Sequence, residues 1–121
     1  MTSRAAIIAD TYVLVRQSNE KVIERLGGNY LTVLPAEIGS LSKLRNLYLS
    51  DNNIHSLPPE IGNVIALDES LLDANAITDP DLLHLGSLSS LRWLNLQKTK
   101  VSNEAVVEHR RRLPQCHVLV D

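Results

Sequence analysis

A spacing of aliphatic residues recurs three times in this chain and constrains its fold more than any other feature. Residues 44–54 read Leu-x-x-Leu-x-Leu-x-x-Asn-x-Ile, and the pattern returns at 67–77 with Ser70 at its second leucine position. It returns again at 91–101 with Thr99 in place of the asparagine. Self-similarity at a period of about 20–50 residues is typical of solenoids. Each unit is therefore predicted to add one strand to a curved parallel sheet, with the other half of the unit on the convex side.

The pattern extends towards the N-terminus. Counting back 23 residues from Asn52 reaches Asn29, although Lys21 and Glu24 stand where leucines are expected in this first unit. Residues 1–20 fit no repeat: their apolar residues suit a helix, while residues 12–15 would suit a strand equally well. Because an open solenoid exposes its first apolar face, residues 1–20 are interpreted as a mainly helical cap. The alternative left open is a helical docking or dimerisation arm, which would make a homo-oligomer.

Towards the C-terminus, a last unit is predicted to begin at Leu113. It places Cys116 and Val118 at the next two core positions and Asp121 where the asparagine would be. The chain of 121 residues suits one domain. Its predicted parts are a cap (1–20), four repeats (21–112) and a closing strand (113–121).

Each position of the pattern has a physical role. In a strand, alternate leucines face the core. The asparagines at 29, 52 and 75 are expected to form a ladder that bonds otherwise buried backbone groups, with Thr99 as a weaker last member. Ser70 is a departure, because a hydroxyl at a core position needs a partner or a water. On the convex side, Thr78 or Asp79 before Pro80 is a helix N-cap signal, and residues 102–104 lead into a second predicted helix at 105–112.

These motifs resemble those of leucine-rich-repeat proteins over about residues 21–121. The segments 34–39 (LPAEIG) and 57–62 (LPPEIG) resemble the returns of short repeats in Ras-suppressor-like and bacterial intracellular proteins. From residue 77 onwards, ITDPDLLHL and LRWLNLQKTKV are similar to bacterial repeats that have helical convex sides. The resemblance implies an α/β solenoid that works as a non-enzymatic protein-interaction module, without a cofactor.

Side chains between the core leucines of each strand should point out of the concave surface. Tyr48 and Trp93 belong there, and exposed aromatic rings on an interface are typical hot spots. We therefore predict a partner-binding site formed by Tyr48, Glu69, Asp73, Trp93 and Asn95. The three predicted rows on this surface are Ile23, Asn46, Glu69, Trp93 and Gln115; Arg25, Tyr48, Leu71, Asn95 and His117; and Gly27, Ser50, Asp73, Gln97 and Leu119.

Catalytic and metal sites are poorly supported. Cys116 and His117 are strand neighbours, so the thiol should face the core and the imidazole solvent, whereas a nucleophile and its base must meet on one side. No histidine or cysteine pair has the spacing of metal ligands. Gly27 and Gly28 lack the rest of a phosphate-binding loop.

Composition limits the partners and the compartment. A formal net charge of −2 and a pI near 6.1 argue against nucleic acid and membrane surfaces. The apolar run before Asp10 is too short for a secretory signal or a membrane span. One cysteine, Cys116, suits a reducing compartment and hence the cytoplasm. The expected partner is another protein. Two other functions stay open: a regulatory or targeting subunit of an enzyme such as a phosphatase or ubiquitin ligase, and, more distantly, a phosphate or nucleic-acid binder through the arginines at 110–112.

Overall fold

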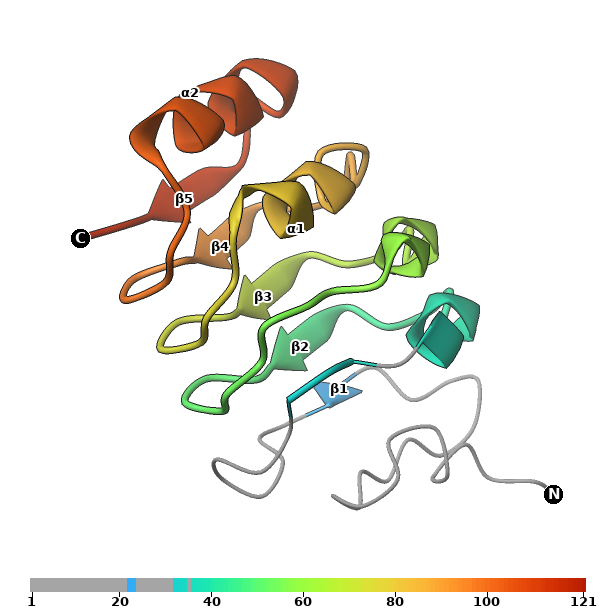
Figure 1. The fold of residues 1–121 in the computed structure, drawn as a ribbon. Coiled ribbons are helices and arrows are strands. Elements are labelled where there is room, and N and C mark those ends of the chain that lie inside the picture. The colour runs from blue at the N-terminus through green and yellow to red at the C-terminus, as the bar shows by residue number, and fades with distance from the viewer. Residues whose placement is uncertain (1–21, 24–31, 35) are drawn as a thin grey trace, which may run out of the picture.

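Five short strands form one parallel sheet in which each strand pairs with the next along the chain (Figure 1). The computed structural model describes residues 22–23, 32–34 and 36–121. The strands are β1 (Val22–Ile23), β2 (Asn46–Tyr48), β3 (Glu69–Leu71), β4 (Trp93–Asn95) and β5 (His117–Leu119). The stacked sheet agrees with the predicted solenoid. The proposed cap at 1–20, together with Arg25, Gly27 and Asn29, lies outside the described residues.

Short helices cover the convex side of the sheet, one between each described pair of successive strands (Figure 1). The two Leu-Pro returns lead into single 3₁₀ turns, η2 (Ala36–Ser40) and η3 (Pro59–Asn63). The later repeats carry α-helices instead, α1 (Asp79–His84) and α2 (Asn103–Arg112). Both predicted caps are confirmed: Thr78 precedes α1, and the Ser102 hydroxyl accepts a hydrogen bond from the Ala105 amide at the start of α2.

The repeat leucines form one continuous core between the sheet and the convex helices. Leu49 and Leu72, at equivalent positions in the two central repeats, are both 0% exposed. Ser70 lies in the same core at 0% exposure, paired across the sheet with Leu47 and Leu94. Its hydroxyl has no hydrogen-bond partner among the described residues. The core position that departs from the pattern is therefore a buried polar group without compensation.

The predicted asparagine ladder is present at the two positions that the structure describes. The Asn75 side-chain amide donates to the carbonyls of Leu49 and Leu72, and its oxygen accepts from the Ile54 amide. Asn52 makes the equivalent contact within its own turn by donating to the Leu49 carbonyl. These bonds satisfy backbone groups that the turn buries. Thr99 takes the last position, where its hydroxyl donates to the Leu96 carbonyl at 2.7 Å.

The first turn of α1 joins three successive repeats. Asp81 is buried, and it accepts from the Leu57 amide of the preceding repeat and from the Thr78 amide at the cap of its own helix. Asp79 accepts from both the amide and the hydroxyl of Ser102 in the following repeat, each at 2.7 Å. These bonds hold the pKa of Asp79 below its usual value. The carboxylates of α1 thus bind the repeats on both sides of it.

The sheet register corrects the predicted rows at the N-terminal end. Val22, and not Ile23, is the partner of Asn46, while Ile23 pairs with Leu47. The interval from β1 to β2 is therefore one residue longer than the 23 residues that separate Asn46 from Glu69. Counting back by the later interval placed Ile23 in the wrong row.

The rows are also wrong at the C-terminal end. His117 pairs with Trp93, where Gln115 was expected, and Leu119 pairs with Asn95, where His117 was expected. Gln115 lies before the strand, and its side chain donates to the Ser89 carbonyl.

The cause is the position of Leu113, which does not begin a new copy of the pattern. The Cys116 amide donates to the Leu113 carbonyl, and the Leu91 amide donates to the Leu88 carbonyl in the equivalent turn of the preceding repeat. His117 lies 24 residues after Trp93, the same interval that separates Trp93 from Glu69, whereas counting from Leu91 to Leu113 gives only 22 residues. Asp121 is consequently two residues beyond Leu119 and not at the asparagine position; its carboxylate accepts from the Lys98 amide.

Candidate partner-binding surface

The concave face of the sheet carries the residues that separate the core leucines. In β4, Trp93 is 51% exposed, while the next residue, Leu94, is buried. Tyr48 in β2 and Glu69 in β3 are half-buried and lie on the same face. The alternation of the strand therefore turns both aromatic rings outwards, as predicted.

Trp93 stacks on His117 where the last two strands begin. The ring centroids are 4.5 Å apart and the planes differ by 18°. The two residues are register partners in β4 and β5. Offset stacking of this kind stabilises both rings in one orientation, so Trp93 is a rigid exposed aromatic surface. Sequence reasoning did not bring His117 next to Trp93, because it counted the last strand from Leu113.

Glu69 lies beside Trp93 on the neighbouring strand, and Asp73 follows the end of the same strand; a neutral hydroxyl group bonds each of the two carboxylates. The Tyr48 hydroxyl donates to Glu69 Oε1 at 2.9 Å, and the Ser50 hydroxyl donates to Asp73 Oδ1 at 2.6 Å. In the part of the chain that the structure describes, neither Glu69 nor Asp73 forms an ion pair. Both carboxylates are therefore oriented, yet no cation of the described chain neutralises them.

A hollow of about 430 Å³ lies over β3, β4 and β5 on this face. Three of the five predicted site residues line it: Glu69, Trp93 and Asn95. Tyr48 reaches it only through its bond to Glu69, and Asp73 is outside the lining. The remaining lining residues, which sequence reasoning did not assign to the site, are Leu71, Leu94, His117, Val118 and Leu119. The volume is within the range of small recognition pockets.

A second hollow, of about 350 Å³, lies on the convex side between α1 and α2. The apolar residues Leu82, Leu83 and Ala105 line it together with the charged residues Asp79, Glu108 and Arg112. His109 also lines it and is 3% exposed, and neither ring nitrogen has a partner among the described residues. Burial, and secondarily the charge of Arg112, keeps the pKa of His109 below its ordinary value. We prefer the concave hollow as the candidate site because it combines an exposed aromatic ring with unneutralised charge.

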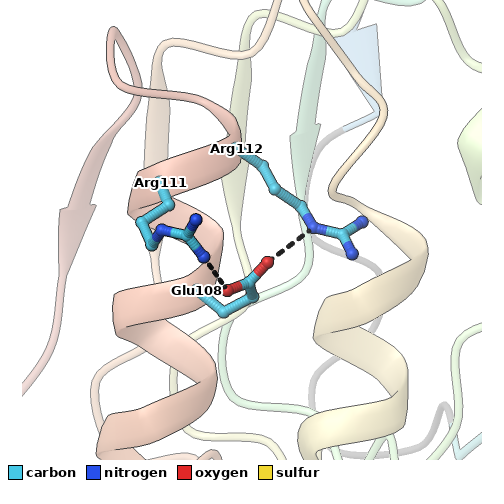
Figure 2. A network of polar contacts seen from close by, with 3 residues as sticks. All are labelled: Glu108, Arg111 and Arg112. Atoms are coloured by element: carbon cyan, nitrogen blue, oxygen red, sulfur yellow. Dashed lines mark hydrogen bonds and ion pairs between the residues drawn. The ribbon is translucent and has the colours of Figure 1, made fainter.

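The arginines at the end of α2 have partners within the protein. Figure 2 shows Glu108 between Arg111 and Arg112, at 2.8 Å and 3.1 Å from their guanidinium nitrogens. Both arginines keep the pKa of Glu108 below its usual value, with the hydrogen bond from Arg112 as the largest cause. Arg110 donates to the Val118 carbonyl. A phosphate bound at 110–112 would therefore compete with contacts that already engage all three guanidinium groups.

The expected separation of Cys116 from His117 is confirmed. Cys116 is 6% exposed in the core, whereas His117 is exposed on the concave face. Burial raises the pKa of the Cys116 thiol to about 11, which leaves it protonated at neutral pH. Within the described ranges, no three histidine, cysteine, aspartate or glutamate side chains gather where they could share a metal ion. None of the described helices has the length and apolar character needed to cross a bilayer.

Comparison with known proteins agrees with the fold. The family model of the leucine-rich repeat matches residues 43–64, which hold the first complete copy of the pattern. A solved leucine-rich-repeat protein of Leptospira interrogans is 32% identical, with a TM-score of 0.68 over 78% of this chain and 24% of its own. The chain is a leucine-rich-repeat protein. The predicted family and fold class are thereby confirmed.

Other leucine-rich-repeat relatives are more distant or much longer. An internalin of Listeria monocytogenes shares the fold at 21% identity and a TM-score of 0.60, over 71% of this chain and 24% of its own. Leucine-rich repeat-containing protein 10 of Bos taurus is 38% identical over 65 residues, which are 51% of this chain. A probable serine/threonine-protein kinase of Dictyostelium discoideum is 34% identical over 97 residues, or 76% of this chain. This chain spans only 23% and 3% of the lengths of those two curated relatives.

Proposed function

We propose that this leucine-rich-repeat protein binds another protein on its concave surface, with Trp93 at the centre of the contact. Leucine-rich-repeat proteins are in general non-enzymatic interaction modules, which supports protein binding without naming the partner. The single observation that carries the choice of surface is the hollow of about 430 Å³ beside the half-exposed Trp93 ring. A rigid aromatic ring in a recess loses little conformational entropy on binding, as hot-spot residues do.

The test compares Trp93→Ala with Leu83→Ala. Leu83 is a matched control because it is also a large, exposed apolar residue, at 56%, but lies on the convex side. A partner is first captured with the wild-type protein, identified by mass spectrometry and purified for calorimetric titration. Loss of a central aromatic residue costs about 2 kcal/mol or more, so Trp93→Ala should weaken binding at least about tenfold. Leu83→Ala should change it less than about twofold.

Two results would refute this surface. One is an unchanged affinity after the double change Tyr48→Ala with Trp93→Ala. The other is a loss confined to Leu83→Ala, which would move the contact to the hollow between α1 and α2. Circular dichroism spectra must match the wild type in every variant, and exposed Trp93 and Leu83 can both be truncated without opening the core.

The second candidate function is a regulatory or targeting subunit of an enzyme. It is favoured by the Dictyostelium relative, a probable serine/threonine-protein kinase in which the matched segment forms a small part of the chain. Interaction modules of this kind can be joined to an enzyme or can associate with one. If the captured partner is an enzyme, its turnover with and without this protein should differ severalfold. Unchanged turnover would leave simple binding as the function.

We further propose that the protein works in the cytoplasm. The buried, protonated thiol of Cys116 supports this proposal, because the sequence has no second cysteine with which it could form an internal disulfide. Fractionation of cells that express the tagged full-length protein tests it. Recovery from an extracellular fraction would contradict the proposal.

A further inference from the structure

We propose that the concave site receives an arginine side chain of the partner, held between the Trp93 ring and the Glu69 carboxylate. This inference rests on the proposed function and adds the chemistry of the bound group. It starts from the sheet register, in which Glu69 and Trp93 are direct partners on the neighbouring strands β3 and β4. Neighbouring strands are about 4.8 Å apart, so the two side chains lie next to each other on one face.

The free face of the indole is on the same side as Glu69. Trp93 stacks on His117 of β5 at a centroid distance of 4.5 Å, which covers one face of its ring. Because β4 lies between β3 and β5, the opposite face of the indole is turned towards β3. Trp93 and Glu69 therefore line two sides of the same hollow, with a π-face on one side and a carboxylate on the other. A cation placed there gains both a cation–π contact and an ion pair.

The charge on this part of the surface favours a cationic group. The bonds from Tyr48 and Ser50 orient Glu69 and Asp73 without neutralising them. Among the described residues, the acidic members of the ion pairs are Asp68 and Glu108 only, so none of the described lysines and arginines pairs with Glu69. The half-buried Glu69 carboxylate accepts the Tyr48 hydroxyl at Oε1, which fixes its orientation and leaves it able to accept a further hydrogen bond from a charged donor.

The chemistry of the residues that line the hollow favours arginine over lysine. A guanidinium group is planar, stacks on an aromatic face and can direct its N–H donors at a carboxylate in the same plane. It is also less strongly hydrated than an ammonium group, so it loses less on entering a recess. Leu71 and Leu119 line the same hollow and offer apolar surface for the three methylene groups of an arginine stem.

The experiment uses Trp93 as the reporter, since it is the only tryptophan in the sequence. The full-length protein, labelled with ¹⁵N, is titrated at low ionic strength with acetyl-Gly-Arg-Gly-amide and with its lysine and citrulline counterparts. Lysine retains the positive charge but lacks the planar group, and citrulline retains a planar group but lacks the charge. The indole N–H resonance should shift saturably with the arginine peptide. Because the planar guanidinium group stacks on the ring and is less strongly hydrated than an ammonium group, arginine should bind about two- to fivefold more tightly than lysine. Citrulline should bind most weakly.

A pair of charge variants locates the site. Glu69→Gln should weaken the arginine peptide about threefold or more, the order expected for a partly exposed charge pair. Glu60→Gln removes the same charge from the exposed convex turn η3 and should leave the titration unchanged. Equal binding of the arginine and lysine peptides, or an equal response of the two variants, would overturn the inference.

The result is separable from the test of the proposed function. If Trp93→Ala abolishes binding of the captured partner while the arginine peptide causes no saturable shift, the arginine inference fails and the concave surface stands. If the arginine peptide binds as expected while Trp93→Ala leaves the affinity of the captured partner unchanged, the arginine pocket stands and the proposed partner surface is wrong.

Discussion

Ser70→Ala should make the protein more stable, although it removes a hydroxyl from the middle of the sheet. Ser70 is 0% exposed, and its Oγ has no partner in the described part of the chain. A buried hydroxyl without a hydrogen bond costs about 1–3 kcal/mol relative to its hydrated state in the unfolded chain. Alanine removes that cost and keeps the Cβ that packs between Leu47 and Leu94.

The expected gain is about 1 kcal/mol. Removing one oxygen atom leaves a small void, whose cost of about a few tenths of a kcal/mol offsets part of the desolvation gain. For a domain of this size, a gain of about 1 kcal/mol corresponds to a rise of about 4 °C in the melting temperature. Urea unfolding followed by circular dichroism should show the same gain as a higher midpoint with an unchanged slope.

Ser50→Ala is the matched control, because it deletes the same hydroxyl group from the turn that follows β2, where the opposite effect is expected. The Ser50 hydroxyl donates to Asp73 at 2.6 Å, and its loss should lower stability by about 1 kcal/mol. If Ser70→Ala instead destabilises the protein as Ser50→Ala does, the Ser70 hydroxyl makes a favourable bond, for example to a bound water. The reasoning from a buried unpaired hydroxyl would then be refuted.

Three further results are expected. Leu49→Ala should lower the free energy of unfolding by about 2–5 kcal/mol, because Leu49 is fully buried between repeats; a loss well under about 1 kcal/mol in a urea melt would contradict the core register. His109→Leu should stabilise the protein more at pH 5 than at pH 8. In the folded protein the pKa of His109 lies below its ordinary value of about 6.5, so the unfolded chain binds more protons and the stability of the wild type falls as pH is lowered through that value. If the substitution shifts the urea midpoint equally at both pH values, protonation of His109 is not the cause. Cys116 has a thiol pKa of about 11, so at pH 8 it should react with iodoacetamide at least about a hundredfold more slowly in the folded protein than in urea. Mass spectrometry measures both rates, and equal rates would place the thiol outside the core.

The repeating leucines predict the stack well because each leucine position depends on the same local alternation of the strand. Leu49 and Leu72 are buried for this reason, and Trp93 is exposed for the same reason. The asparagine positions are equally predictable, because the turn that Asn75 satisfies has the same backbone in each repeat. The capping residues before α1 and α2 are also visible in sequence, since Thr78 and Ser102 stand directly before acidic first turns.

The candidate site is less predictable because it depends on the exact register of short strands. The neighbour of Trp93 is His117 rather than Gln115, because β5 follows β4 at the same 24-residue interval at which β4 follows β3. The interval of 24 residues between the copies at 67 and 91 was the available signal, but the strand register was counted from Leu113 instead. The bond from Tyr48 to Glu69 could not be predicted, since it depends on side-chain rotamers across two strands.

The bonds around the first turn of α1 have a mechanical consequence. A chain of repeats that contact only their neighbours can unravel from one end under load, one unit after another. Here Asp81 holds the repeat before α1 and Asp79 holds the repeat after it, so the third repeat cannot separate from one neighbour without straining its own helix cap. Under a pulling force, residues 57–102 should therefore unfold together in a single rupture event. Unfolding of one repeat at a time is expected only towards the two ends of the stack.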